Sequence, residues 1–347
     1  MNKRIIFYSS VRRGRIKESD SAETHYSIEP FSLGAIRYNL EKRGWVTYYA
    51  TLNTSKSLTK TIQLINEFKP DIVYTYGSTT ALNPLLCRPL CKHKIYKVIH
   101  GWDDVYGEIW GSVFGYIPGL FMDWMEKWII KNSDGVVTLS YYNQQRGRTW
   151  GVESHFIPNG ADIPEIDPSQ KTINLEGRFN LVYTGSMARW KRTYEICEAM
   201  RHLPKDIKLY LTGGYYAYLH KYFSENCIYL GYLPKQVQLN VMSQADVLVV
   251  TADQDCNAKL QEYLRFGKPI LGYDGRLNLF FKNKQNAFLT KDYPHAIQRL
   301  ANDSQFCKML TEHAKNDIPI YSWAEIAMQF ENYFLSFFKG EKDVLRT

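Results

Sequence analysis

Short apolar runs alternate with amphipathic stretches along most of this chain, and that alternation constrains its fold more than any other feature. The runs are rich in β-branched and aromatic residues, which predicts buried strands, and they lie at 5–9, 45–50, 71–76, 95–99, 136–140, 179–184, 207–212, 246–251 and 269–272. Between them, stretches such as 31–43 and 59–68 carry apolar residues at helical spacing. Strands that alternate with helices predict an α/β protein with parallel sheets.

A polar stretch with prolines, residues 161–177, interrupts the alternation near the middle of the chain. The chain has 347 residues, which is enough for two domains at about 150 residues each. We therefore expect two doubly wound, Rossmann-like domains. Open parallel sheets bind ligands at the carboxyl ends of their strands, so the loops of both domains should face a cleft.

The chain carries 43 Lys and Arg residues against 35 Asp and Glu residues, which gives a formal net charge of +8. The basic residues are dispersed, and no zinc-finger, RRM or helix-turn-helix signature accompanies them. This distribution argues against a nucleic-acid partner. It favours a phosphate-bearing small molecule or a membrane surface as the partner.

The six cysteines are scattered, which is typical of reduced thiols rather than of a disulfide framework. Cys87, Cys91 and His93 cluster, but their spacing without a second pair is a weak metal pattern, so we favour a packed helix-to-loop stretch and expect no metal site. The basic start Met1–Arg4 precedes an apolar stretch too short for a signal peptide, and no run approaches the roughly 18 residues that span a bilayer. These features predict a cytoplasmic protein.

The segment 257–270, with the sequence NAKLQEYLRFGKPI, predicts a helix that starts in a loop after a buried strand and stops at Gly267. Lys259 and Glu262 are three residues apart, so they share one face of this helix. A carboxylate near the start of such a helix can accept hydrogen bonds from two neighbouring ribose hydroxyls. By spacing alone, an ordinary surface ion pair is the favoured interpretation.

The same segment resembles the C-terminal signature of GT-B-fold glycosyltransferases, most like glycosyltransferase family 4. Further motifs stand in the order of that family over residues 156–338, namely Phe156–Asp162, Leu181–Ser186 with Trp190 and Lys191, Tyr229–Pro234, Ala245–Val250, Asn286–Leu289 and Tyr321–Trp323. One such motif is weak evidence, but the ordered set is specific. The N-terminal half is similar only in Phe31–Tyr49 and in Ile99–Asp103.

The resemblance implies a GT-B fold with residues 1–165 as an N-terminal acceptor domain, 166–325 as a nucleotide-sugar donor domain, and a helix in 326–347 that returns to the N-terminal domain. It implies transfer of a sugar from a UDP- or GDP-sugar to an acceptor hydroxyl, with retention of configuration. The nucleotide sugar is a co-substrate, and we expect no tightly bound cofactor. The expected acceptor is a lipid-linked compound or a glycan in polysaccharide, glycolipid or glycoprotein-glycan assembly.

In the family, a Gly at a strand end and a Lys about six residues later belong to the diphosphate site, and Gly185 and Lys191 match them. The leaving diphosphate gains negative charge as the glycosidic bond breaks, so a cation there stabilises the transition state more than the ground state. Ser186 stands where the family usually has an Arg. Arg189 or Arg192, in the same loop, can substitute for it.

Glu262 matches the ribose-binding Glu of the family. The other Glu of the family's pair, eight residues earlier, is Gln254 here, which can bind a sugar hydroxyl without a charge. Asp253 and Asp255 are alternatives for that contact. The resemblance implies three further donor-binding residues, which are Tyr232 beside the base, Asn257 in the diphosphate pocket, and Lys259.

In the first half, His100 follows a strand that we expect to end at Ile99, and it matches the family's His beside the reacting carbon of the donor sugar. Asp103 or Asp104 is expected to orient the acceptor hydroxyl. The Gly-Gly loop typical of the family is absent near the N-terminus. Gly14, within a cluster of arginines, can serve instead as the glycine that approaches a phosphate, or its loop can contact the acceptor.

Residues 105–131 carry more aromatic and aliphatic side chains than one helix face against a core needs. One hypothesis places part of this segment on the cytoplasmic face of a membrane, where it receives an amphiphilic acceptor. The other hypothesis buries the segment inside the N-terminal domain.

Two alternative functions stay open. A nucleotide-sugar epimerase of the same fold would keep the nucleotide site and need acid and base groups in the cleft. A non-catalytic GT-B partner protein would bind nucleotide without turnover, and Gln254 and Ser186 are the residues that favour it.

Overall fold

The computed structural model describes residues 3–9, 17–28, 32–51, 54, 56–77, 79–162, 173–256 and 259–338. The chain forms two compact units. Unit 1 combines the residues up to Ala161 with those from Tyr321 onward, and unit 2 runs from Asp162 to Ile320. The divisions expected after residues 165 and 325 fall a few residues further along the chain.

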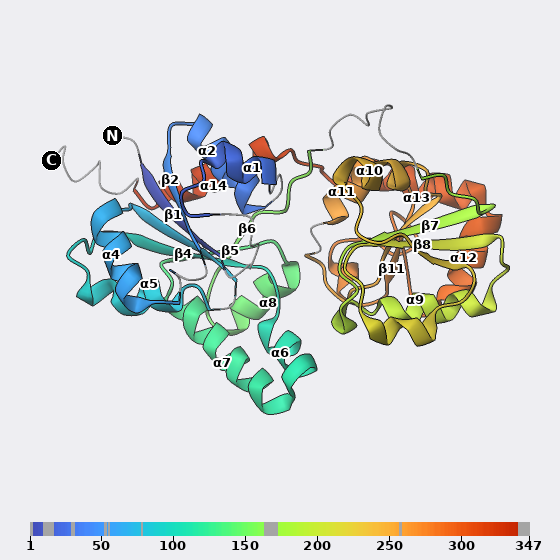
Figure 1. Cartoon of the computed structure of the whole chain (residues 1–347), viewed down its shortest axis with the longest axis horizontal. Coiled ribbons are helices and arrows are strands. Elements are labelled where there is room, and N and C mark those ends of the chain that lie inside the picture. The colour runs from blue at the N-terminus through green and yellow to red at the C-terminus, as the bar shows by residue number, and fades with distance from the viewer. Residues whose placement is uncertain are drawn as a thin grey trace. The chain divides into compact units, whose positions relative to one another are not determined.

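Unit 1 contains a parallel sheet of six strands among its described residues, in the order β2-β1-β3-β4-β5-β6 (Figure 1). The strands are β1 (Arg4–Ser9), β2 (Val46–Ala50), β3 (Ile72–Tyr76), β4 (Lys97–Trp102), β5 (Gly135–Thr138) and β6 (His155–Phe156). The expected end of β4 at Ile99 is wrong. The strand continues because His100 pairs with Thr75 on β3 and Trp102 pairs with Thr138 on β5.

Helices cover both faces of this sheet. The described α-helices of unit 1 are α1 (Ala22–Ile28), α2 (Leu33–Lys42), α4 (Leu58–Phe68), α5 (Leu82–Cys87), α6 (Tyr106–Phe114), α7 (Tyr116–Asn132), α8 (Tyr141–Thr149) and α14 (Trp323–Ser336). Residues of α2 and α14 form one core with the sheet, and residues of α4, α5 and α7 form another on its other side. Cys87 and Cys91 lie in this second core with their sulfur atoms 3.7 Å apart, while the His93 ring bonds the Pro70 carbonyl oxygen.

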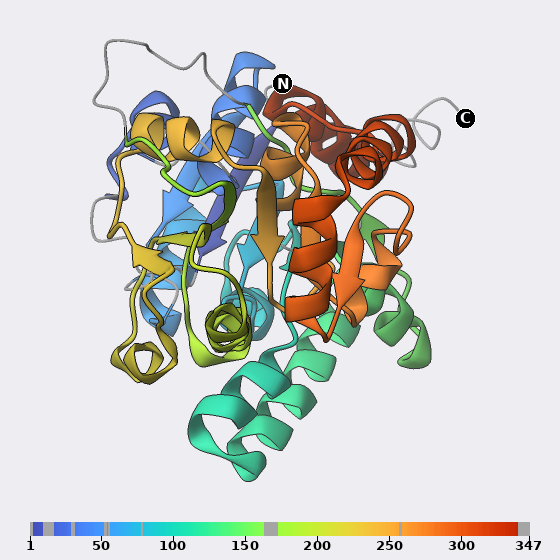
Figure 2. The ribbon, with the colours of Figure 1, turned by 90° about the vertical axis from the view of Figure 1, so that its right-hand side faces the viewer.

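The aromatic segment expected over 105–131 forms a hairpin of two helices, α6 and α7. The chain reverses at Gly115, whose φ of 98° is a conformation that glycine adopts without the strain a side chain would cause. Both views show the hairpin extending away from the sheet of unit 1 (Figure 1, Figure 2). The inner half of α7 is buried through Met122, Met125 and Ile129, so this part of the segment lies inside unit 1, as the second hypothesis expects.

The last described helix, α14, packs in unit 1 although it follows unit 2 in the sequence. It begins with a capping box, in which Ser322 and Glu325 bond each other's backbone N–H groups. Its apolar face places Phe330 and Phe334 against α2 and β3, with the Phe334 ring 5.8 Å from that of Tyr74. The expected return of the C-terminal helix to the first domain is therefore confirmed.

Unit 2 contains a second parallel sheet of six described strands, in the order β12-β11-β10-β7-β8-β9. The strands are β7 (Phe179–Thr184), β8 (Ile207–Thr212), β9 (Cys227–Tyr229), β10 (Val247–Val250), β11 (Ile270–Tyr273) and β12 (Phe288–Thr290). The chain starts in the middle of the sheet at β7, proceeds to one edge, and returns to β10 on the other side. This is the strand order of a doubly wound Rossmann sheet, so the expectation of two such domains is confirmed.

Two layers of helices enclose this sheet as well. The helices of unit 2 are α9 (Thr193–Ala199), α10 (Lys235–Ser243), α11 (Lys259–Arg265), α12 (Tyr293–Asn302) and α13 (Ser304–Asp317), together with the short 3-10 turn η2 (Arg189–Lys191). Residues of α9, α12 and α13 form a core with one face of the sheet, and residues of α10 and α11 with the other. Alternate residues of β7 divide between these two cores, as the two-residue period of a strand requires.

Replacing Phe334 by Ala should lower the free energy of unfolding of unit 1 by about 3–5 kcal/mol, because a fully buried aromatic ring is removed from a packed core. Differential scanning calorimetry should show the transition of unit 1 moving to lower temperature while that of unit 2 stays in place. Met328→Ala, an exposed position on the same helix, is the matched control and should leave both transitions unchanged. Equal effects of the two substitutions would contradict the packing of α14.

Candidate functional site

The chain order of unit 2 reverses between β7 and β10, because β7 continues to β8 on one side and β10 continues to β11 on the other. The loops that leave the carboxyl ends of β7 and β10 therefore run in opposite directions. In doubly wound sheets, a ligand crevice forms at this switch point. The predicted residues Gly185, Ser186, Arg189 and Lys191 lie after β7, and Gln254, Lys259 and Glu262 follow β10.

The loop after β7 is held in one conformation by hydrogen bonds from its surroundings. The Gly185 amide donates to the Thr212 carbonyl oxygen at 2.7 Å, and the Met187 amide donates to that of Gly214 at 3.0 Å. Hydroxyl groups of three more residues donate to backbone carbonyl oxygens of the loop, and these residues are Tyr183, Tyr218 and Thr251. With its backbone fixed, the loop presents Ser186 and Arg189 as exposed side chains.

Lys191 links the two sides of the switch point. Its ammonium nitrogen donates a hydrogen bond to the Gln254 amide oxygen at 2.9 Å, and it lies 3.8 Å from the centroid of the Trp190 ring. Because Gln254 is neutral, this hydrogen bond leaves the positive charge of Lys191 in place. The arrangement suits an anion that enters between the two loops.

Lys259 occupies the first position of α11 and reaches under the loop after β7. Its Nζ lies 4.3 Å from the Tyr183 ring centroid, and a Cβ at Gly185 would stand only 2.2 Å from that Nζ. Desolvation by burial, and then the neighbouring charge of Lys191, hold the pKa of Lys259 well below its usual range. Two lysines thus meet at the switch point, which is unfavourable until an anion neutralises them.

Glu262 lies one turn into α11, where its carboxylate pairs with Lys235 at the start of α10 and also acts electrostatically on Lys259. Lys191, Gln254, Lys259 and Glu262 therefore form one group, which we name the switch-point cluster. Lys235 is a partner that the sequence analysis missed. Its position at the start of the helix that follows the Tyr229–Pro234 motif could have indicated this role.

The remaining donor-binding predictions have different outcomes. Tyr232 follows β9 and is 87% exposed, and the adjacent Gly231 carbonyl oxygen accepts hydrogen bonds from the Thr212 hydroxyl at the end of β8 and from the Gly213 amide. Arg192 pairs with Glu195 and lies over the Tyr273 ring, so its charge already has partners within the fold.

Two of the predicted residues cannot be placed. Asn257 lies outside the described residues, as does Gly14 of unit 1. Asp253 caps the Arg276 backbone amide at 2.7 Å.

In unit 1, His100 is a buried strand residue rather than a loop residue. It is 1% exposed, and its Nδ1 lies 2.8 Å from the Thr75 hydroxyl oxygen on the adjacent strand. Burial lowers the pKa of His100 to about 3, so the ring is neutral at physiological pH. The expectation that His100 follows the end of its strand is wrong, because β4 includes it.

Asp103 is the first residue after β4, at the carboxyl edge of the unit 1 sheet. Its carboxylate accepts hydrogen bonds from the Tyr106 hydroxyl and from the Asp104 amide, the latter at 2.9 Å. Burial, and then the charge of Asp103, raise the pKa of Tyr76 and of Tyr106 well above the usual range, so both phenols stay protonated. An aspartate held in this way can accept a hydrogen bond from a bound hydroxyl group.

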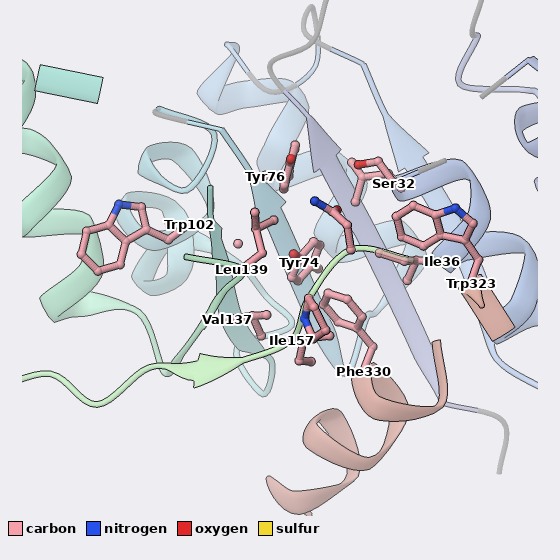
Figure 3. A pocket seen from close by; sticks show the side chains of 14 residues that line it. Ser32, Ile36, Tyr74, Tyr76, Trp102, Val137, Leu139, Ile157, Trp323 and Phe330 are labelled. Carbon is pink, nitrogen blue, oxygen red and sulfur yellow. The ribbon is translucent and has the colours of Figure 1, made fainter. Parts of the chain in front are cut away.

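A small pocket opens beside this edge, between the sheet and the helices α2 and α14 (Figure 3). Its volume of about 20 Å³ is enough for one water molecule. Aromatic side chains line much of it, and these are Tyr74, Tyr76, Trp102, Trp323 and Phe330. The close-up shows Tyr76 and Ser32 at one end of the pocket and Phe330 at the other (Figure 3).

A buried ionic network fixes the loop around Asp103 to the α6–α7 hairpin. Glu126 of α7 accepts hydrogen bonds from the Trp102 indole and from Arg146 of α8, both at 2.7 Å. Arg146 also pairs with Asp123. Desolvation outweighs the attraction of Arg146 and raises the pKa of Glu126 from 4.5 to about 7. Among the described residues, no group of His, Cys, Asp and Glu has the geometry of a metal site.

Comparison with solved structures shows the fold class to which this geometry belongs. Sucrose-phosphate synthase of Thermosynechococcus elongatus superposes with a TM-score of 0.76 at 16% identity, over 98% of this chain and 100% of that one. HepE of Anabaena, in complex with UDP and glucose, gives 0.69 at 14% identity over 96% and 100%. A UDP-N-acetylglucosamine 2-epimerase gives 0.58 at 14% identity, over 97% of each chain.

These structures share the GT-B architecture, and the chain therefore has the GT-B fold that its motifs imply. No model of a protein family matches the chain, and no curated protein matches its sequence. The fold is common to nucleotide-sugar glycosyltransferases and to nucleotide-sugar epimerases, so the activity has to be argued from the site.

Gly185→Ala should lower the free energy of unfolding by about 1–3 kcal/mol, because the new Cβ meets the Lys259 side chain and the residue keeps a positive φ of 115°. Chemical denaturation measures the loss. Gly231→Ala has a positive φ but open space around it, so it reports the strain without the collision. The double variant with Lys259→Ala should recover part of the loss, and an absence of recovery would contradict the contact.

The stability of unit 1 should depend on pH through Glu126. Its pKa is raised in the folded state, so the contribution is complete below pH 4.5 and is lost as the pH rises to about 7. The change is on the order of 3 kcal/mol. Urea unfolding at a series of pH values should show that Glu126→Gln removes this dependence, whereas Glu153→Gln, at an exposed position, retains it. Identical pH profiles for the two variants would refute the assignment.

Proposed function

We propose that the protein is a glycosyltransferase that moves a sugar from a UDP- or GDP-sugar to an acceptor hydroxyl. The observation that carries the proposal is the switch-point cluster, in which two lysines and a glutamate meet where doubly wound sheets bind their ligands. The complex of the similarly folded HepE with UDP and glucose supports a nucleotide-sugar donor.

In this proposal, unit 2 binds the donor. The diphosphate lies between the loops after β7 and β10, where Lys191 and Lys259 neutralise the charge that grows as the glycosidic bond breaks. Glu262 accepts hydrogen bonds from the ribose hydroxyls, and Gln254 is placed to bind a sugar hydroxyl. Ser186 and Arg189 extend the diphosphate site, Asn257 borders it, and Tyr232 packs on the base.

Transfer with retention follows from a front-side attack. The bond between the anomeric carbon and the diphosphate oxygen breaks, the acceptor oxygen bonds the same carbon from the same face, and the acceptor proton passes to the departing phosphate. Asp103 of unit 1 orients the acceptor hydroxyl. His100, which is neutral and buried, is a positioning residue that joins β4 to β3 through the Thr75 hydroxyl. The acceptor is a lipid-linked compound or a glycan.

Nucleotide specificity is tested by the melting temperature of the protein with UDP, GDP, ADP or CMP. A ligand that binds only the folded state raises the melting temperature, and we expect UDP or GDP to do so. Failure of all four nucleotides to raise it would contradict the donor site.

Lys191→Ala and Glu262→Ala should each lower kcat/KM for nucleoside diphosphate release from the donor by more than about tenfold, or roughly 1.4 kcal/mol. Release can be followed with water as the acceptor. The matched controls are Lys205→Ala and Glu225→Ala, an exposed ion pair that precedes β8 and β9 at the amino edge of the same sheet. These controls should retain wild-type kinetics, and wild-type kinetics in the site variants as well would remove the assignment.

A nucleotide-sugar epimerase is the second candidate, because UDP-N-acetylglucosamine 2-epimerase has the same fold over nearly the whole chain. Incubation with nucleotide sugars alone separates the two functions. An epimerase converts the sugar and leaves the nucleotide attached, whereas a transferase releases the nucleoside diphosphate. Nucleotide binding without either product would instead support a non-catalytic partner protein.

A further inference from the structure

The tip of the α6–α7 hairpin exposes a continuous set of large apolar side chains. Eight of them are between 37% and 78% exposed, namely Trp110, Val113, Phe114, Tyr116, Ile117, Leu120, Phe121 and Trp124. No residue from Ile109 to Met122 is charged. The surfaces of soluble proteins seldom carry so many adjacent apolar side chains, so this surface, which we name the hairpin tip, is a candidate binding surface.

The two helices of the hairpin meet through glycines instead of apolar side chains. A Cβ at Gly119 would stand 2.8 Å from the Gly107 carbonyl oxygen and 2.9 Å from the Gly111 Cα, so the two backbones are in direct contact. In water, a helical hairpin normally fills this seam with its apolar residues. Here the seam leaves no room for them, and the large side chains face outward, which is the packing of helices that lie in an apolar medium.

The hairpin tip is suited to a lipid interface rather than to a flat protein surface. Its side chains come from both helices around the turn at Gly115, and the ribbon of this hairpin projects from unit 1 (Figure 1, Figure 2). Trp, Tyr and Phe account for five of the eight residues, and these side chains are favoured where lipid headgroups meet acyl chains.

The exposed charges next to the hairpin tip are two lysines of α7 and one carboxylate, that of Glu108 at the start of α6. Along α7, Asp123 and Glu126 are both paired with Arg146, whereas Lys127 and Lys131 are exposed. Exposed lysines beside an inserted apolar surface are attracted to an anionic headgroup layer. Within the described ranges, none of the helices combines the length and apolar character needed to cross a bilayer.

We propose that the hairpin tip inserts into the interfacial layer of an anionic lipid bilayer. The ionic network of Glu126 and Arg146 joins the base of the hairpin to Trp102, the residue before Asp103. Docking therefore fixes the bilayer relative to the edge of the unit 1 sheet that carries Asp103. This inference does not depend on sugar transfer, and vesicle binding tests it separately from nucleotide binding.

The first experiment is flotation of the full chain with vesicles of phosphatidylcholine, with or without phosphatidylglycerol. The wild-type chain should float with the anionic vesicles at low salt. The affinity of the variant Ile117→Ser/Leu120→Ser/Phe121→Ser/Trp124→Ser for these vesicles should be lower by at least about tenfold, because its apolar anchor is removed. Its melting temperature should match that of the wild type, because these side chains are exposed.

Two further variants separate the parts of the argument. Leu58→Ser/Leu279→Ser removes exposed apolar residues that are not part of the hairpin tip and should retain vesicle binding. Lys127→Glu/Lys131→Glu should lower binding to anionic vesicles by about tenfold and leave the fold intact. Unchanged binding in this charge variant would refute the preference for anionic lipid.

Tryptophan fluorescence provides a readout that does not depend on the serine variant folding. Addition of anionic vesicles should shift the emission of the wild type to shorter wavelength, and Trp110→Phe/Trp124→Phe should lose most of that shift. Absence of flotation and of a shift in the wild type at low salt overturns the proposal. So does a concentration-dependent dimer that the serine variant abolishes without any vesicle binding, since the hairpin tip would then cover a second copy.

Discussion

The candidate site depends on the missing side chain of Gly185. The loop after β7 and the start of α11 come from opposite sides of the switch point, and the Lys259 side chain fills the space that a Cβ would take. This contact keeps a lysine close to Lys191 despite the repulsion between them. The surrounding tyrosines, Tyr183 and Tyr263, fix the same strand end through their hydroxyl groups. In the proposed function, the negative charge of a diphosphate offsets this repulsion between the two lysines.

Much of the architecture could be predicted from the sequence because it follows from local patterns. Apolar runs of strand length identified most strands of both sheets, although not the short edge strands β9 and β12, and an ordered set of motifs indicated the GT-B fold. The positions of Lys191 and Glu262 could be predicted for the same reason, since each stands at a fixed distance in sequence from a strand end or a helix start. The return of α14 to unit 1 came from the resemblance, not from periodicity.

Other features depend on contacts between distant residues, which spacing does not encode. The extension of β4 through Trp102 arises from pairing with β3 and β5, and it buries His100 where a loop residue was expected. The ion pair of Glu262 with Lys235 joins two helices far apart in the sequence. The glycine contact between α6 and α7 could not be predicted, because it exists only when the two helices turn back on each other. The excess of aromatic residues in this segment, by contrast, is evident in the sequence.

The position of α14 has a consequence for how the protein is made. Phe330 and Phe334 complete the core of unit 1, yet they are translated after the whole of unit 2. Unit 2 is continuous in sequence and can close its core while synthesis proceeds. Unit 1 cannot complete its core until α14 has been synthesised, so an apolar face of its sheet stays uncovered while unit 2 is made, and such a face favours aggregation of the nascent chain.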